Sequence, residues 1–467
     1  MKNRTNIKKL LITCFVQGFI LLLSVLPGFV LPEKMGPTNY GYWQVYLFYL
    51  AYLNIFGLGF NDGLALTYGG YEYEKLPYKR IRASIRLISL YSIIICVLGL
   101  ILCFIVNISN INKLIFAMLV INIPLTCIQC IILTLFLSVT KTSLYNAINL
   151  LLKIFSVTSY FIVLYLGHIS SVSLICVDTL VRLIITILCI FLGRRFIFGE
   201  SGTLKEGWTE LYTNSKSGIK LTIALIISML MPVMSRWIVE QYESMESYGI
   251  YSFAISLLSL ILSFTNVLGT VLFPLLKRLD PISTRKNYYL YCLVSNLFVI
   301  FALFLYIPLY YLIQNIMIQY TPALQYLPFL LIMCIPLGRI QLLIIPFYKA
   351  YRLEKDLLKM NIIGLLIIFI SLVAIHAIFK SITLIALFSS LFIFIWTFAA
   401  EMHFTNSFDS KPIIKRTIFD LIIMFIFCLA CFQSSILYFC LIYSLGVSLY
   451  CFLQKKEIKE LLFEIKM

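Results

Sequence analysis

Four charged residues lie deep inside long apolar stretches of this 467-residue sequence, far from their ends. Lys153 lies about halfway along one stretch, and Asp178 and Arg182 lie near the middle of the next. Arg339 lies deep in a third stretch. At the centre of a membrane-spanning helix, each charge costs about 2.5–3.5 kcal/mol on insertion scales. We therefore expect these residues to face a protein interior or a water-filled cavity, where they could bind a charged ligand.

The spacing of these residues predicts one ion pair within a helix and two cations with no acidic partner on their own helix. Asp178 and Arg182 are four residues apart, so they share a helix face and can pair. Lys153 and Arg339 have no acidic residue at that spacing, so their anion comes from elsewhere in the chain or from a substrate. A cavity with a net positive charge suits a phosphate or pyrophosphate group. A structural Asp178–Arg182 pair and a Lys153 that reaches the membrane surface are the alternative interpretations.

Asp62 is a fifth candidate, because it lies in a glycine-rich segment at the end of another apolar stretch. The segment 57–70 reads GLGFNDGLALTYGG, and its glycines allow tight turns or a close contact between helices. Asp62 could cap the next short helix, pair with arginines of a loop, or bind a coupling cation. These three interpretations stay open at this point.

Fourteen apolar stretches carry these residues, and most are about 20 residues long, which is the length that crosses a bilayer as a helix. The sequence predicts spans at 10–31, 40–60, 87–107, 113–139, 143–166, 171–192, 219–239, 248–273, 288–313, 324–347, 359–379, 382–400, 417–431 and 435–453. Prolines interrupt several of them, most of all the span 324–347. We therefore expect an all-α integral membrane protein with about 14 transmembrane helices.

The basic residues predict how these spans are oriented. Of the 37 Lys and Arg residues, three lie inside apolar stretches, and only Lys34, Lys113, Arg236 and Lys380 belong to the odd-numbered gaps. The other thirty lie in the even-numbered gaps and the two tails. Because cytoplasmic loops carry an excess of Lys and Arg, both termini are predicted to be cytoplasmic.

Composition excludes several other functions. The chain is 61% hydrophobic and 12% charged, and its net charge of +17 lies at helix ends, so we expect no nucleic-acid binding. Its 13 cysteines and three histidines are scattered, so no metal or other cofactor is expected. No nucleotide-binding motif occurs, which indicates that ATP does not drive the protein directly.

The loops indicate two repeated halves. We expect an N-terminal six-helix lobe at 1–193, a cytoplasmic linker at 194–218, a C-terminal six-helix lobe at 219–403, and two extra helices with a basic tail at 404–467. Tyr40-Gly41 and Tyr248-Gly249 begin the second helix of each half, as in a parallel duplication. This layout predicts two pseudo-symmetric six-helix bundles.

Three features resemble polysaccharide flippases of the multidrug/oligosaccharidyl-lipid/polysaccharide exporter superfamily, of the O-antigen and capsule repeat-unit type. The segment 32–41 (PEKMGPTNYG) is similar to the family's Leu-Gly-Pro-x-x-Tyr-Gly signature. The segments 59–63 (GFNDG) and 68–70 (YGG) resemble a stretch of capsule-type members. The third feature is the layout of six and six helices with two more at the C-terminus. Thr67 stands where members of this type often have an arginine, so no role is carried over to that position.

The resemblance implies a flippase of the bacterial inner membrane that moves undecaprenyl-pyrophosphate-linked oligosaccharide to the outer leaflet. It implies alternating access around a central cavity, with Lys153, Arg182 and Arg339 as substrate-binding cations and Asp178 and Asp62 as coupling or structural acids. It also implies a proton or sodium gradient as the energy source. The partners would be membrane lipids, the lipid-linked oligosaccharide, and a polysaccharide polymerase with its chain-length machinery. We expect no enzymatic activity.

Two other functions remain possible from the sequence. A cation-coupled multidrug exporter of the same fold would need a carboxylate-rich site, and acids inside the spans are scarce. A membrane-embedded polymerase or glycosyltransferase would need acids, bases or a sugar-binding domain near the outer face. The largest external segment, 240–247 (EQYESMES), has acids but no accompanying domain.

Overall fold

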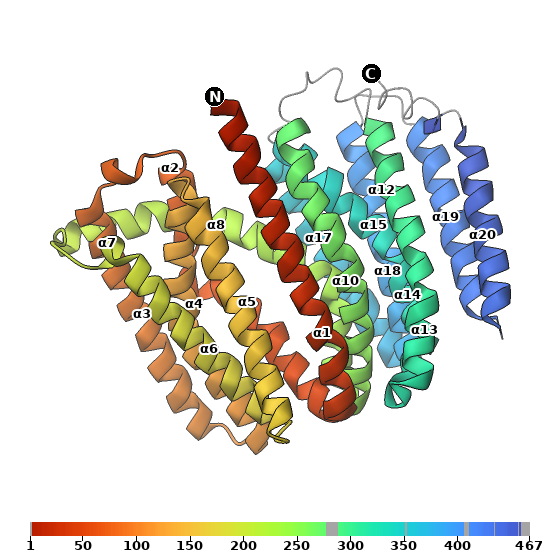
Figure 1. The fold of residues 1–467 in the computed structure, drawn as a ribbon, viewed down its shortest axis with the longest axis horizontal. Helices are drawn as coiled ribbons and strands as arrows, with labels where there is room; N and C mark the ends of the chain where they lie inside the picture. The colour runs from red at the N-terminus through yellow and green to blue at the C-terminus, as the bar shows by residue number, and fades with distance from the viewer. Residues whose placement is uncertain are drawn as a thin grey trace. The chain divides into compact units, whose positions relative to one another are not determined.

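The structure of the protein is a computed structural model that describes residues 2–276, 288–350, 353–405, 411–433, 435–455 and 457–458. The regular secondary structure in these ranges is helical throughout, which confirms the predicted all-α class (Figure 1). The chain forms two compact units, Met1–Met229 (unit 1) and Leu230–Met467 (unit 2). Most of the predicted basic tail at the C-terminus lies outside the described residues.

Unit 1 is built from long membrane helices and short interfacial ones. Its helices are α1 (Lys2–Leu50), η1 (Leu53–Gly57), α2 (Phe60–Tyr68), η2 (Tyr73–Lys75), α3 (Tyr78–Ile105), α4 (Asn110–Ser138), α5 (Thr142–Tyr165), α6 (Ser171–Leu192), α7 (Arg194–Ile197) and α8 (Leu204–Leu230). Helix α4 packs against α3, α2 and α6, while α5 packs against α6 and α1. Phe136 of α4 and Phe196 of α7 are fully buried and lie edge to face in the core.

Helix α1 contains the predicted span 10–31 and the first part of the span 40–60 in one helix, and η1 forms most of the rest of that second span. The backbone at Gly36 has φ 71° and ψ 163°, which breaks the helical path. Because a residue with a side chain rarely adopts a positive φ, glycine is favoured at this kink. Pro32 and Pro37 on either side of Gly36 also weaken the helix at this point.

Helix α2 lies directly against α8, and glycines make this contact possible. A Cβ on Gly63 would stand 2.0 Å from the carbonyl oxygen of Asn214, and one on Gly218 would stand 2.0 Å from the carbonyl oxygen of Gly59. The side chain of Thr67 donates to that of Asn214 at 2.6 Å. Small residues therefore let two backbones touch, as they do between membrane helices.

A second contact between α2 and α8 joins Tyr68 to Glu210, whose Oε1 accepts a hydrogen bond from the phenol at 2.5 Å. Glu210 Oε1 also accepts from Asn214 Nδ2 at 2.7 Å. Burial, together with the hydrogen bond to Glu210, raises the pKa of Tyr68. The phenol is therefore protonated at neutral pH and acts as the donor.

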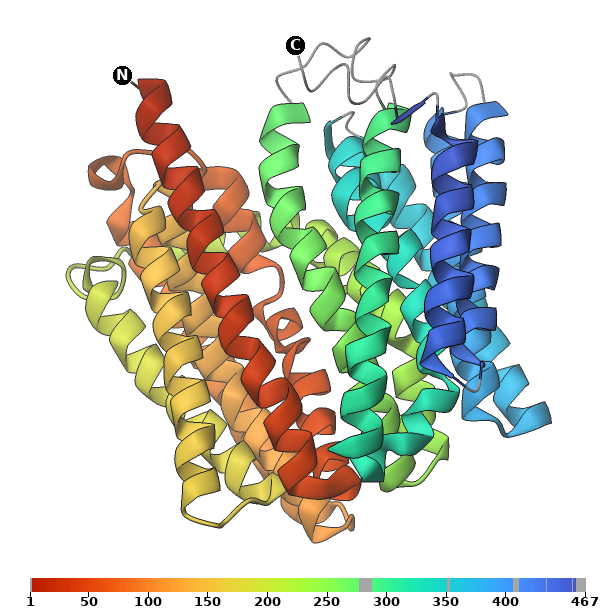
Figure 2. The same ribbon diagram turned by 45° about the vertical axis from the view of Figure 1, so that its right-hand side comes forward.

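Unit 2 has the same helical character. Its helices are η3 (Met231–Val233), α9 (Met234–Tyr242), α10 (Met245–Leu276), α12 (Tyr288–Ala302), η4 (Leu303–Leu305), α13 (Tyr306–Asn315), η5 (Ile318–Gln325), α14 (Leu327–Ile332), α15 (Cys334–Arg339), η6 (Ile340–Ile344), α16 (Ile345–Ala350), α17 (Glu354–Phe379), α18 (Ile382–Thr405), α19 (Lys411–Cys431) and α20 (Ile436–Leu453). Helices α19 and α20 run side by side (Figure 2). Helix α14 packs against both α18 and α19.

The proline-rich span 324–347 is the most interrupted helix of unit 2. It is divided into α14, α15, the π-helix η6 and α16. Proline removes a backbone donor and frees a carbonyl, and π-helical turns are typical of such disturbed helices. Arg339 is the last residue of α15, directly before the π-helix.

Twelve helices of the described chain are long and apolar enough to cross a membrane, compared with the fourteen spans predicted. One of the twelve, Phe15–Gly57, overlaps both of the first two predicted spans. Helix α19 is not among them, because Lys415, Arg416 and Asp420 make it too polar. Counting α1 as two spans and adding α19 restores the predicted number.

The predicted linker 194–218 is largely helical, which differs from the sequence interpretation. Residues 204–218 form the first half of α8, and this helix continues into the predicted span 219–239. The boundary between the compact units falls at 229/230, next to Pro232. A helix begins here because Thr203 and Glu206 form a capping box at the start of α8.

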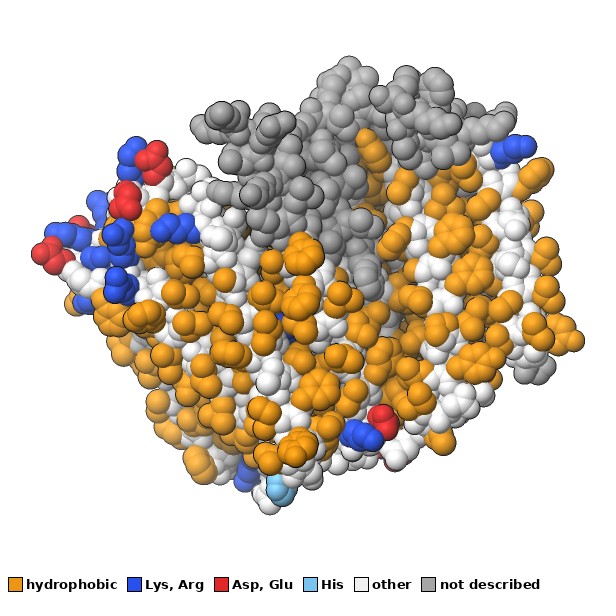
Figure 3. All heavy atoms as spheres, in the orientation of Figure 1, with side chains coloured by type: hydrophobic (Ala, Val, Ile, Leu, Met, Phe, Trp, Pro, Cys, Tyr) orange, Lys and Arg blue, Asp and Glu red, His pale blue; other side chains and the backbone are white. Residues whose placement is uncertain are grey.

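Hydrophobic side chains cover most of the visible surface, as expected for a protein in contact with lipid (Figure 3). Lys and Arg side chains gather at the end of unit 1 where α7 lies. There, Arg195 pairs with Glu74 at 3.2 Å and Lys79 pairs with Glu200 at 2.7 Å. The nearby Lys79 lowers the pKa of the Glu200 carboxyl.

Candidate functional site

Asp178 of α6 is the centre of a polar site inside unit 1. Its Oδ2 accepts hydrogen bonds from Tyr46 Oη at 3.0 Å and from Arg182 Nε at 2.7 Å. Its Oδ1 accepts from Tyr160 Oη at 2.6 Å. The Asp178 side chain is only 2% exposed. The pair predicted from the spacing of Asp178 and Arg182 is therefore present, and two tyrosines complete the shell of the carboxylate.

A second group of side chains fixes these tyrosines. Asn122 Nδ2 donates to Tyr46 Oη at 3.2 Å and to Thr179 Oγ1 at 3.0 Å. The ring of Trp43 stacks on Tyr46 with 5.5 Å between centroids, and it meets Tyr160 edge to face. The site thus draws on α1, α4, α5 and α6, and each polar group holds the orientation of the next.

Arg182 retains donors that the site does not use. Its side chain is 21% exposed, and its hydrogen bond to Asp178 uses Nε. In the described ranges of the chain, its terminal nitrogens Nη1 and Nη2 have no hydrogen-bond partner. A guanidinium held through Nε presents these two nitrogens together, in the geometry that suits phosphate oxygens.

Lys153 of α5 lies near the same site and is partly exposed. It interacts electrostatically with both Asp178 and Arg182. No carboxylate within 4.0 Å pairs with it among the residues that the structure describes. With Lys153 and Arg182 charged against the single carboxylate of Asp178, the site carries a net positive charge.

Asp62 belongs to a different place in unit 1. It lies in the first turn of α2, and its carboxylate accepts a hydrogen bond from Thr222 Oγ1 of α8. The N-cap residue of α2 is Gly59, so Asp62 does not cap the helix through its side chain. Asp62 therefore strengthens the contact between α2 and α8. A coupling role for it stays a prediction.

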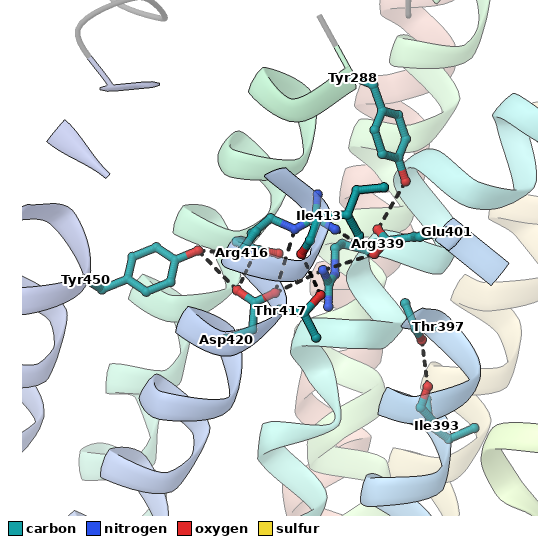
Figure 4. A network of polar contacts seen from close by, with 11 residues as sticks. Tyr288, Arg339, Ile393, Thr397, Glu401, Ile413, Arg416, Thr417, Asp420 and Tyr450 are labelled. Atoms are coloured by element: carbon teal, nitrogen blue, oxygen red, sulfur yellow. Dashed lines mark hydrogen bonds and ion pairs between the residues drawn. The ribbon is translucent and has the colours of Figure 1, made fainter. Parts of the chain in front are cut away.

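Arg339 lies in unit 2, inside a buried cluster of two arginines and two carboxylates (Figure 4). Its Nη1 is 2.9 Å from Asp420 Oδ2 and 3.5 Å from Glu401 Oε2. Arg416 Nη2 is 2.5 Å from the same oxygen of Glu401. The two arginine side chains are at most 6% exposed, and the two carboxylates are fully buried.

Neutral side chains complete this ion cluster. Tyr288 Oη donates to Glu401 Oε1 at 3.1 Å. Asn296 Nδ2 donates to Asp420 Oδ1 at 2.7 Å, and Tyr450 Oη donates to the same oxygen at 3.2 Å. Two cations balance two anions, so the cluster presents no excess charge to a ligand.

The cluster corrects one expectation about Arg339. The sequence interpretation left open that its anion is the substrate, but Glu401 and Asp420 supply that anion. Glu401 lies one residue after the predicted span 382–400, and Asp420 lies close to the start of the span 417–431, so neither was counted among the charges near the middle of a span. Arg416 and Asp420 are four residues apart, and this spacing is the signal that could have identified them.

The described part of the chain contains no group of three or more His, Cys, Asp or Glu residues that could hold a metal ion. Twelve of its cysteines are free thiols, including Cys127 and Cys130 on α4.

No protein-family model matches this sequence, and no curated protein sequence matches it either. Among solved structures, "Lipid II flippase MurJ, inward closed conformation" has a TM-score of 0.68 at 16% identity and covers 96% of this chain and 100% of its own. "Crystal structure of MATE in complex with MaL6" has a TM-score of 0.50 at 11% identity, with 86% and 96% covered. At these identities the likeness shows the fold alone, which the chain shares with these two structures.

Proposed function

We propose that this protein is a flippase that translocates undecaprenyl-pyrophosphate-linked oligosaccharide repeat units across a bacterial inner membrane, for O-antigen or capsule synthesis. The observation that carries the proposal is the net positive site of unit 1, where Arg182 and Lys153 outnumber the one carboxylate of Asp178. The fold shared with a lipid II flippase supports a lipid-linked substrate. Transport would proceed by alternating access from the cytoplasmic to the outer leaflet.

In this proposal Arg182 binds the pyrophosphate and Asp178 positions it. Asp178 and its two tyrosines hold the guanidinium through Nε, which leaves Nη1 and Nη2 for phosphate oxygens. Lys153 adds a mobile point charge at the same site. Because the site is largely dehydrated, these contacts are stronger than they would be in water. Arg339 supports the fold of unit 2 and does not bind the substrate.

We propose that an ion gradient, of protons or sodium, drives the cycle, with Asp178 as the first candidate for the coupling acid. A proton on Asp178 would release Arg182 from its ion pair and change the net charge of the site. Partners would be the polysaccharide polymerase and its chain-length machinery, and both termini would be cytoplasmic.

A cation-coupled multidrug exporter is the second candidate. The observation that favours it is the buried carboxylate of Asp178, with the aromatic side chains of Trp43, Tyr46 and Tyr160 around it. Such a site could hold an organic cation if Arg182 moved away. The two candidates differ in which residue contacts the cargo, namely Arg182 for a pyrophosphate and Asp178 for a cation.

A deletion strain tests the two candidates. Lipid-linked intermediates would be measured by mass spectrometry, and a membrane-impermeant lectin would report the leaflet that they occupy. We expect complete repeat units to accumulate on the inner leaflet. Repeat units that accumulate on the outer leaflet would place the defect in polymerisation, and an unchanged lipid profile would favour the drug exporter.

The role of Arg182 is tested by a charge-balanced comparison of Arg182→Gln, Asp178→Asn and the double variant in proteoliposomes. If Arg182 binds pyrophosphate, the double variant transports as poorly as Arg182→Gln, about 10- to 100-fold below wild type. If Arg182 only neutralises Asp178, the double variant regains transport. Thermal unfolding of each purified variant separates a loss of binding from a loss of folding.

A further inference from the structure

The first half of α8, residues 204–220, exposes an apolar stripe. Leu204, Trp208 and Tyr212 are 78%, 63% and 58% exposed, although all three are large and hydrophobic. They are spaced four residues apart, so they line one face of the helix. This stripe is not used in the packing of unit 1.

A row of lysines borders this stripe. Lys205, Lys216 and Lys220 are exposed, and helical geometry places them on the neighbouring face. The ammonium of Lys216 lies 5.8 Å from the ring centroid of Tyr212, so the two faces meet at that point. In the described chain none of the three lysines pairs with a carboxylate.

The two acidic residues of this segment are already engaged. Glu206 Oε2 accepts hydrogen bonds from the backbone N–H and the hydroxyl of Thr203. Glu210 accepts from Tyr68 and Asn214, as described above. These donors are neutral, so both carboxylates keep their charge, and residues 204–220 carry three lysines against two glutamates, a net charge of +1.

The remaining face of this segment is buried in unit 1. Gly207 lies against Ala83 of α3, where a Cβ would stand 2.8 Å from the Ala83 methyl group. Asn214 and Gly218 lie against α2. In Figure 1, α8 runs across the picture while α3, α4, α5 and α6 run obliquely from top to bottom. A helix that crosses the membrane helices in this way, with one face buried and one apolar face exposed, has the geometry of an interfacial helix.

We propose that residues 204–220 form a binding surface for anionic phospholipid headgroups in the plane of the membrane. Leu204, Trp208 and Tyr212 enter the boundary between headgroups and acyl chains, and the three lysines contact the anionic headgroups. The aromatic residues suit this boundary because they have an apolar body and a polar edge. Each basic residue near an anionic surface strengthens binding about fivefold. This surface does not depend on the transported substrate.

The fluorescence of Trp208 tests the proposal in the full-length protein. Wild type and Trp208→Phe would be reconstituted in phosphatidylcholine vesicles with and without phosphatidylglycerol, and their difference spectrum isolates Trp208 from the other three tryptophans. We expect acyl-brominated phosphatidylglycerol to quench Trp208 more strongly than brominated phosphatidylcholine at equal mole fraction.

The triple variant Lys205→Gln/Lys216→Gln/Lys220→Gln should lower this preference for phosphatidylglycerol by roughly tenfold or more. The control removes three cations elsewhere, as Lys34→Gln/Lys113→Gln/Lys380→Gln, and should keep the preference. Equal quenching by both lipids in wild type, or an unaffected triple variant, would overturn the proposal. So would a Trp208 that aqueous iodide quenches fully in vesicles and that becomes shielded only when a protein partner is added.

Discussion

At the scale of single residues, the two arginines predicted to bind substrate differ in how their charge is met. Arg182 shares one carboxylate with two tyrosines, and its two terminal nitrogens have no partner among the residues that the structure describes. Arg339 lies between two carboxylates in a cluster that is closed to solvent. A candidate binding arginine is therefore distinguished from a structural one by the number of carboxylates around its guanidinium. Its position within a predicted membrane span does not distinguish them.

Balanced removal of charge from the buried cluster of unit 2 should be tolerated better than single removal. Glu401→Leu or Arg416→Met alone leaves an uncompensated buried charge, which costs about 3–5 kcal/mol. The double variant leaves the Arg339–Asp420 pair at 2.9 Å and no excess charge. We expect thermal unfolding in detergent to show a smaller loss of stability for the double variant than for either single variant.

Lys415→Gln is the matched control on the same helix, because Lys415 is exposed and its ion pair with Glu457 is long. It should unfold at the wild-type temperature. If the losses of the two single variants add in the double variant, then Glu401 and Arg416 stabilise the protein independently, and the cluster is not the cooperative unit described here.

The Asp178 site should be sensitive to the loss of a single hydroxyl. Tyr160→Phe removes the donor to Asp178 Oδ1 and leaves a buried carboxylate oxygen without it. The expected loss is about 1–3 kcal/mol in the free energy of unfolding. Tyr165→Phe is a control on the same helix, because its ring is 89% exposed. Equal melting temperatures for the two variants would show that Tyr160 does not hold the carboxylate.

The spacing rule that identified Asp178 and Arg182 also applies to Arg416 and Asp420, yet that second pair was missed. Arg416 lies one residue before the predicted span 417–431, so it was counted as a loop cation. The partners of Arg339 come from other helices, and no pattern along one helix reveals them. Local pairs could thus be predicted from the sequence, whereas contacts between distant helices could not.

At the scale of the elements, α2 and α8 behave as one body because their backbones touch at glycines. No side chain fills the space between Gly63 and Asn214, and Asp62 and Thr67 add hydrogen bonds on either side. Helix α8 ends at the boundary between the two units. Its contact with α2 therefore holds the start of α8 against the rest of unit 1.

A methyl group at this contact should separate the two helices. Gly63→Ala would place a Cβ 2.0 Å from the Asn214 carbonyl oxygen, so α2 or α8 must shift. Overpacking of this kind costs about 1–3 kcal/mol and sometimes more. We expect a lower melting temperature and a weaker yield in membranes.

Gly28→Ala on α1 is the control for this substitution, because a Cβ there meets nothing within 4 Å. Helix propensity alone would make that variant slightly more stable. If Gly63→Ala is as stable as Gly28→Ala, then α2 and α8 are not in close contact in the membrane.

Hydrophobic patterning predicted most elements, and one of them to the residue. The predicted span 171–192 coincides with α6, which a serine capping box begins. The linker was misread as a loop because its glycines and polar residues lack an apolar period, although Thr203-Leu204-Lys205-Glu206 carries a capping-box pattern. The glycines that lowered the helix propensity of this segment are the ones that contact α2 and α3. Tertiary packing therefore overrode local propensity.

At the scale of the whole molecule, the distribution of basic residues makes a prediction about sidedness. Lys75→Cys and Lys380→Cys lie in exposed parts of different units, on opposite sides of the membrane by the positive-inside rule. A membrane-impermeant maleimide should label position 380 in intact cells and position 75 only after permeabilisation. Labelling of the wild-type protein, with its native cysteines, gives the background. The reverse pattern would place both termini outside the cytoplasm.

The buried ion cluster of unit 2 also determines the order in which the protein can mature. Arg339 is synthesised 62 residues before Glu401, and Arg416 and Asp420 follow later still. During translation α15 therefore reaches the membrane with an arginine whose carboxylate partners do not yet exist. Until α18 and α19 leave the ribosome, that charge has to stay near water or within the insertion machinery. Helices α18 and α19 thus complete the burial of an arginine made earlier, and unit 2 cannot reach its final packing before both have been synthesised.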